Sequence, residues 1–158
     1  CWAGGGGRGA LISRNSETFP SISCQAFGGA DNNDAACGSV YLEKPSQASG
    51  RGVLLANNNS LSTAANVYME LPAAGESNPW ELAWTILTLT NGTYVGLISN
   101  VKIGDLFIRT NTATRLYLNG YTLTLATPFH PDWGDTNWVV YGGGQIIWGM
   151  KGTVMIYR

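Results

Sequence analysis

Charged side chains are scarce in this sequence. Lysine, arginine, aspartate and glutamate together make up 12% of its 158 residues, and the formal net charge is −1. This share is about half of the usual one. Nucleic acids and acidic membrane surfaces attract clusters of basic side chains, and the composition supplies no such excess. We therefore expect no nucleic-acid partner.

Long apolar runs are also missing. No stretch approaches the roughly 20 apolar residues that a membrane-spanning helix needs, so we expect no transmembrane segment. The first residues lack the basic and apolar regions of a signal peptide, so an exported protein would already have lost its signal. Asn, Thr, Ser and Gly supply the polar bulk in place of Lys and Glu. That surface is typical of extracellular β-proteins and predicts an extracellular or cell-surface location.

Cysteine occurs only in the first quarter of the chain, at Cys1, Cys24 and Cys37. A disulfide between Cys24 and Cys37 would close a loop of about 14 residues and contribute about 3 kcal/mol in an oxidising compartment. Cys1 is then left over. Its thiol is expected to pair upstream in a longer chain, to pair with another subunit, or to carry the lipid of a bacterial lipoprotein. Three buried free thiols are the alternative.

Helical periodicity is nearly absent, and short runs rich in Val, Ile, Leu, Tyr and Thr alternate with Gly and Asn. These runs predict one all-β domain over residues 1–158. The predicted strands are 10–13, 39–42, 52–56, 66–71, 85–90, 94–98, 105–110, 114–118, 121–126, 138–141, 145–148 and 153–157.

Two all-β architectures fit this pattern. Asn119-Gly120 between two alternating runs is a strong hairpin signal, which favours an antiparallel β-sandwich. A parallel β-solenoid needs strands and turns that recur about every 20 to 25 residues. Apolar triplets at 53–55, 106–108 and 146–148 are compatible with one face of such stacked coils. Periodicity alone does not separate the two folds.

A series of phrases along the chain bears on this choice. They are GGGGRGALI, FGGADNNDAACG, SVYLEK, GRGVLLANNNS, LYLNGYTLTL and GGQIIW. Their order resembles the Gly-rich segments of large secreted bacterial surface and adhesin-like proteins. The resemblance implies a right-handed parallel β-helix and, because such proteins are much longer, a fragment or terminal piece of one. It also implies that the glycines at 4–7 form a coil corner, where close backbone stacking leaves no room for Cβ atoms.

Motifs for catalysis and metal binding are weak. The glycine run lacks the G-K-[ST] ending and the following helix of a phosphate-binding loop. Asp31 and Asp34 offer a calcium alternative, but their spacing fits no known calcium loop and is usual turn chemistry. We expect neither a metal nor another cofactor.

The sole histidine, His130, lies in a proline-bounded loop near Asp132 and Asp135. Together with Arg115, these carboxylates are the only candidates for a polysaccharide-cleaving site on a β-helix. No nucleophile or second histidine accompanies them, so we expect His130 to pack the loop and the protein not to be an enzyme.

Aromatic residues give the second functional hypothesis. Trp133, Trp138 and Trp148 cluster near the C-terminus, where exposed rings would stack on sugars and buried rings would fill the core or an interface. Asn58 and Asn91 begin N-x-S/T sequons, which matter only in a eukaryotic secretory pathway.

Low charge and strand-rich edges favour stacking of β-modules. The sequence therefore predicts a structural or adhesive protein that self-assembles, or joins other cell-surface proteins, in an extracellular fibre or layer. The alternative is a carbohydrate-binding module that uses exposed tryptophans, with polysaccharide as partner, and a polysaccharide-active enzyme is a more distant third.

Overall fold

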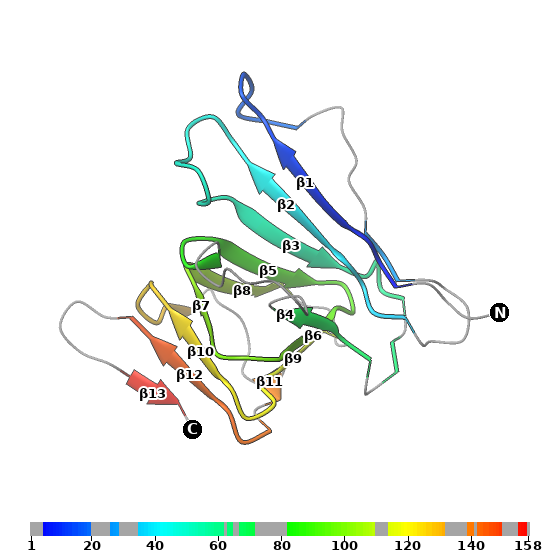
Figure 1. Ribbon diagram of the computed structural model, residues 1–158, viewed down its shortest axis with the longest axis vertical. Helices are drawn as coiled ribbons and strands as arrows, with labels where there is room; N and C mark the ends of the chain where they lie inside the picture. Colours follow the sequence, from blue (N-terminus) through cyan, green and yellow to red (C-terminus); the bar gives the residue numbers. More distant parts are fainter. Residues whose placement is uncertain are drawn as a thin grey trace.

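The computed structural model describes residues 5–19, 26–28, 35–61, 63–64, 67–71, 82–109, 114–131, 139–140, 142–149 and 155–157. These residues form mostly β-strands and turns (Figure 1), so the predicted all-β class is confirmed. The strands are β1 (Arg8–Ile12), β2 (Ser39–Glu43), β3 (Val53–Asn57), β4 (Met69–Leu71), β5 (Ile86–Thr90), β6 (Tyr94–Leu97), β7 (Val101–Ile103), β8 (Asp105–Arg109), β9 (Arg115–Tyr117), β10 (Thr122–Leu125), β11 (Val139–Val140), β12 (Gln145–Trp148) and β13 (Met155–Tyr157).

The strands form three sheets. Sheet A has the order β1-β2-β3-β5-β8, sheet B the order β11-β9-β6-β4, and sheet C the order β13-β12-β10-β7. From β3 to β12 consecutive strands enter different sheets: β5, β6 and β7 lie in A, B and C, and β8, β9 and β10 repeat that order. β8 pairs in parallel with β5, β9 with β6, and β10 with β7.

Two described strand pairs are antiparallel, β2 with β3 and β12 with β13. The other pairs are parallel, including β1 with β2 and β3 with β5. The sheets are therefore mixed, with parallel pairing predominant. This finding overturns the alternative of an antiparallel sandwich, because most successive strands join different sheets instead of forming hairpins.

The Asn119-Gly120 turn shows why the hairpin prediction is wrong. Both residues have positive φ, 52° and 83°, and the Tyr121 N–H donates to the Leu118 carbonyl at 2.9 Å. This local geometry is that of the predicted tight turn. However, the turn leads from β9 in sheet B to β10 in sheet C, so it makes a corner between sheets.

The core lies between the three sheets, where alternate strand residues point inward. Leu87 lies beside Leu106, and Leu89 beside Ile108, in the parallel register of β5 and β8. Apolar side chains thus stack on apolar side chains from one strand to the next. Fully burying one such leucine contributes about 1.5–3 kcal/mol. The largest fully buried side chains are Trp148, Leu87, Leu89, Leu97, Ile103, Leu106, Leu116, Leu118, Leu123, Leu125, Ile146 and Val95.

The N-terminal glycines show the close backbone approach expected of them at one position. The Gly6 N–H donates to the Ala36 carbonyl at 2.9 Å, and a Cβ added to Gly6 would overlap the backbone of Gly38 and Ala26. A Cβ on Gly7, in contrast, would meet nothing within 4 Å. Gly4 lies outside the described residues. The cost of ordering this glycine run is thus matched by tight stacking at Gly6.

Gly38 offers a test of this stacking. A Cβ added to Gly38 would overlap the Gly7 carbonyl oxygen and would lie 2.6 Å from the Gly6 carbonyl carbon. Because backbone atoms must then move apart, we expect Gly38→Ala to lower the free energy of unfolding by about 2–3 kcal/mol or more. Gly9→Ala is the matched control, since a Cβ there meets nothing within 4 Å. Urea unfolding of both variants measures the difference, and equal midpoints would contradict the close stacking.

Candidate functional site

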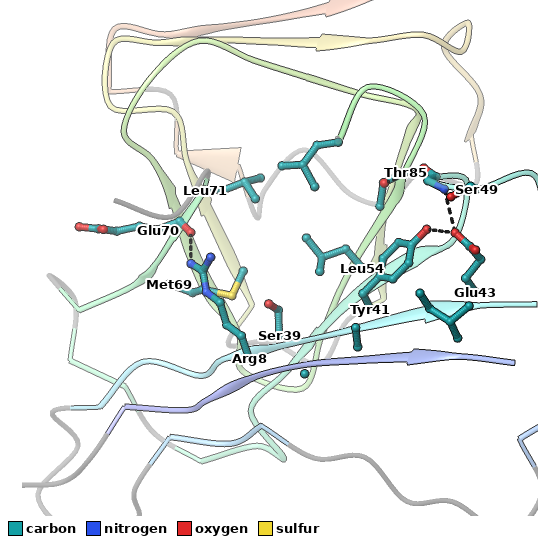
Figure 2. A pocket seen from close by; sticks show the side chains of 15 residues that line it. Arg8, Ser39, Tyr41, Glu43, Ser49, Leu54, Met69, Glu70, Leu71 and Thr85 are labelled. Carbon is teal, nitrogen blue, oxygen red and sulfur yellow. Dashed lines mark hydrogen bonds between the residues drawn. The ribbon is translucent and has the colours of Figure 1, made fainter. Parts of the chain in front are cut away.

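A groove with a volume of about 630 Å³ lies at the end of the molecule where sheet A extends beyond the other sheets. Strands β1 and β2 form the overhang (Figure 1), whereas sheet B ends at β4. Alternate residues of β1 and β2 line one side, among them Ala10 and Tyr41. Leu54 of β3 lies beside Tyr41 on the same side, and Met69 and Leu71 of β4 line the other side, so the middle of the groove is apolar (Figure 2).

A buried carboxylate lies at one end of this groove. Glu43 is 3% exposed, and its Oε2 accepts hydrogen bonds from the Tyr41 hydroxyl at 2.6 Å and the Gly50 N–H at 2.8 Å (Figure 2). The hydrogen bond from Tyr41, and to a smaller extent that from Gly50, lowers the pKa of Glu43. Burial, and then the hydrogen bond to Glu43, raise the pKa of Tyr41. At neutral pH the pair is therefore an ionised carboxylate and a neutral phenol.

Arg8 lies at the other end, where its Nη2 donates to the Glu70 carbonyl oxygen at 3.2 Å. The Glu70 side chain itself extends away from the groove (Figure 2). The described lining residues thus place one cation and one anion at opposite ends of an apolar surface.

The motifs singled out in the sequence did not predict this groove. The local signal was the pair Tyr41 and Glu43, because residues two apart in a strand lie on the same face. The opposing wall comes from β4 of sheet B, and only the packing of the two sheets brings it near.

His130 packs against β8. Its Nε2 lies 2.9 Å from Asp105 Oδ1, which also accepts a hydrogen bond from the Thr127 hydroxyl at 2.8 Å. The imidazole also lies against Phe107, with ring centroids 5.2 Å apart. Of the other residues considered for catalysis from sequence, Arg115 lies on β9 in sheet B. Asp132 and Asp135 lie outside the described residues.

For Trp148 the alternative of sugar stacking is wrong, and the alternative of core packing is confirmed. Its side chain is 1% exposed and belongs to the core, with Phe129 edge-on at 5.4 Å between ring centroids. The reason is strand alternation, which turns Ile146 and Trp148 of β12 inward. Trp133 and Trp138 lie outside the described residues. The exposed tryptophan in the described part of the chain is Trp84, at 52%, which sequence analysis did not single out.

The predicted glycosylation of Asn58 is wrong for the folded chain. The residue is 1% exposed, and its Nδ2, the atom that would carry a glycan, donates to the Leu61 carbonyl at 3.0 Å and to the Thr63 hydroxyl at 2.9 Å. Its Oδ1 accepts from the Gly28 N–H at 2.9 Å. Asn91 is half-buried in a turn with φ of 52°, and its sequon stays a prediction.

Cys37 is a free thiol in the structure, not half of a disulfide. It is 3% exposed in the core, and burial raises its pKa from 9.0 to about 11 in spite of a hydrogen bond with Thr93. Its predicted partner Cys24 lies outside the described residues, as does Cys1.

The calcium alternative, Asp31 and Asp34, also lies outside the described residues. Within the part of the chain that is described, no three His, Cys, Asp or Glu side chains are grouped for a metal ion. None of the helical segments described there is long and apolar enough to cross a membrane.

No protein-family model, no curated protein and no solved structure matches the chain. The resemblance to adhesin-like segments therefore stays a prediction.

The carboxylate of the groove predicts a pH dependence of stability. Because the folded state lowers the pKa of Glu43, its ionisation stabilises the fold at pH values above its ordinary pKa of 4.5, and this contribution is lost as the pH falls through the lowered value. We expect Glu43→Gln to be less stable than the wild type at pH 7, with a smaller difference at pH 3. Urea unfolding at both pH values measures this, with the exposed Glu70 as control (Glu70→Gln). A difference that does not change with pH would contradict the prediction.

The state of Cys37 is tested by alkylation. A buried thiol with a pKa of about 11 has almost no thiolate at pH 8, so iodoacetamide should leave Cys37 unmodified in the native protein. After unfolding in urea without reductant, Cys37 should be modified, as seen by mass spectrometry of its peptide. If Cys37 instead requires a reductant before it reacts in urea, it is held in a disulfide.

Proposed function

We propose that the chain is a module of a right-handed parallel β-helix in a secreted structural or adhesive protein. Its function is to join other β-strands, from copies of itself, in an extracellular fibre or layer. The ordered return of the chain to sheets A, B and C supports the helical arrangement, since each return adds one parallel strand to each sheet. The proposal assigns no catalysis to the chain.

The edge of sheet A is the observation that carries this proposal. β1 is the outermost strand of the sheet, and four of its five residues are exposed. The Ser39 N–H donates to the Gly7 carbonyl at 3.2 Å, and the Ser13 N–H donates to the Glu43 carbonyl at 2.9 Å. The odd-numbered residues of this segment therefore bond to β2. The N–H and C=O groups of even-numbered residues such as Ala10 point to the other side, where no strand of the described residues pairs with them.

The sequence of this edge also supports a joining role. Natural proteins protect outer strands with lysine, proline, bulges or a covering segment, because an open edge recruits other strands. β1 reads RGALI and has one charged residue and no proline. At the opposite side of the same sheet, β8 is the outermost described strand, and Thr127 and His130 contact its Asp105. Pairing of this end of the sheet in one copy with β1 in the next is a head-to-tail contact, and such a contact forms a filament when it does not close into a ring. Cys1 stays a predicted cross-link between subunits.

Ala10→Pro is the variant that tests this edge. Proline removes the outward N–H of Ala10 and leaves the odd-numbered bonds to β2 in place, so the edge is blocked with little change in the fold. We expect electron microscopy at neutral pH without reductant to show filaments of the wild type and discrete particles of Ala10→Pro. Leu11→Pro is the matched control, because its N–H points to β2, and it should lower the unfolding midpoint.

Two results would overturn the proposed function. One is a wild type that stays as discrete particles at every concentration tried. The other is an Ala10→Pro variant that forms filaments as the wild type does.

A further inference from the structure

Trp84 is the most exposed of the large apolar side chains in the described residues, and two cations lie over its ring. Arg51 Cζ is 4.8 Å and Lys102 Nζ is 5.8 Å from the ring centroid. The three residues come from separate segments: Arg51 precedes β3, Trp84 precedes β5, and Lys102 lies on β7. All three are exposed.

The backbone holds these side chains together. Val53 pairs with Ile86 in the parallel register of β3 and β5, so Arg51 and Trp84, each two residues earlier, lie side by side on the same face. That face is opposite to the one on which Leu54 lines the groove. The Gly104 N–H donates to the Thr85 carbonyl at 2.9 Å, which brings the end of β7 beside Trp84. The cluster thus follows from strand register and does not depend on the assembly proposed above.

Within the described chain, no ion pair joins Arg51 or Lys102 to an aspartate or a glutamate. The ring face of a tryptophan attracts cations by about 0.5–1 kcal/mol at exposed sites, which holds both side chains near one point. Two like charges gathered at one exposed ring leave a local positive site in a protein whose net charge is −1.

We propose that Arg51, Trp84 and Lys102 form a binding site for an acidic polysaccharide, with uronate sugars as the ligand class. A guanidinium pairs with a carboxylate through two parallel hydrogen bonds, and an ammonium adds a second charged donor. The exposed indole offers apolar surface to the C–H groups of a sugar ring. A polyphosphate backbone fits less well, because nucleic-acid binding needs a wide basic field, and the whole chain has nine lysines and arginines.

The test uses oligogalacturonate as the probe and its methyl-esterified form as the matched neutral ligand. Isothermal titration of the full chain should show binding of the acidic form and much weaker binding of the ester. A charged hydrogen bond is worth about 1.5–3 kcal/mol, so Arg51→Gln with Lys102→Gln should weaken binding by about tenfold or more. Lys44→Gln with Arg109→Gln removes the same charge elsewhere and should change the affinity less than about twofold.

Arg109 makes this control a strict one, since its Cζ also lies 4.8 Å from an aromatic centroid, that of Phe107. Trp84→Phe separates the role of the indole: ligand should shift the tryptophan fluorescence of the wild type and leave that of Trp84→Phe unchanged. Circular dichroism and the thermal midpoint of each variant confirm that the exposed substitutions leave the fold intact.

Any of four results would overturn the proposal. They are no binding of oligogalacturonate at millimolar concentration, equal binding of the methyl ester, equal loss of affinity in the control pair, and tighter binding of single-stranded DNA than of the uronate. None of these depends on whether filaments form, so the site and the proposed assembly succeed or fail separately.

Discussion

Parallel pairing in register, between strands that lie about 4.8 Å apart, is the constraint on which the rest of the structure depends. It places each side chain directly beside the side chain at the same position of the neighbouring strand. Inward positions on neighbouring strands are therefore occupied by apolar side chains. Val95 lies beside Leu116, and Leu97 belongs to the same core. The turns at the corners also stack on one another in register. The Asn119-Gly120 turn stacks on Gly142-Gly143, and all four residues have positive φ.

Local pattern was sufficient to find most of the strands but not their partners. Each predicted run overlaps a strand of the structure, because alternation and turn residues are local properties. β7 was missed, since it has three residues and only Gly104 separates it from β8. Partners are decided by long-range packing, which is why the same Asn-Gly signal that marks a hairpin elsewhere makes a corner here. The triplet at 146–148, expected on one face with 53–55 and 106–108, lies in sheet C instead of sheet A.

The burial or exposure of the candidate functional residues also depends on long-range packing, which local sequence does not show. Trp148 and Trp84 each follow two apolar residues, yet one is in the core and the other on the surface, because packing of the sheets decides which residues of a strand point inward. Asn58 lies in a polar run whose composition is typical of an exposed turn. It is buried instead, because its side-chain amide forms hydrogen bonds with backbone groups at a corner. The groove and the Trp84 cluster each combine segments that are far apart in the sequence.

The scarcity of charge follows from the stacking as well. In a parallel register a cation would stand next to another cation wherever the sequence repeats, and such like-charge neighbours are unfavourable on a sheet. Three of the described basic side chains lie over aromatic rings: Arg109 over Phe107, and Arg51 and Lys102 over Trp84. A ring holds a cation without neutralising its charge. Among the described residues, Trp84 is the ring over which two cations lie, and both keep their charge.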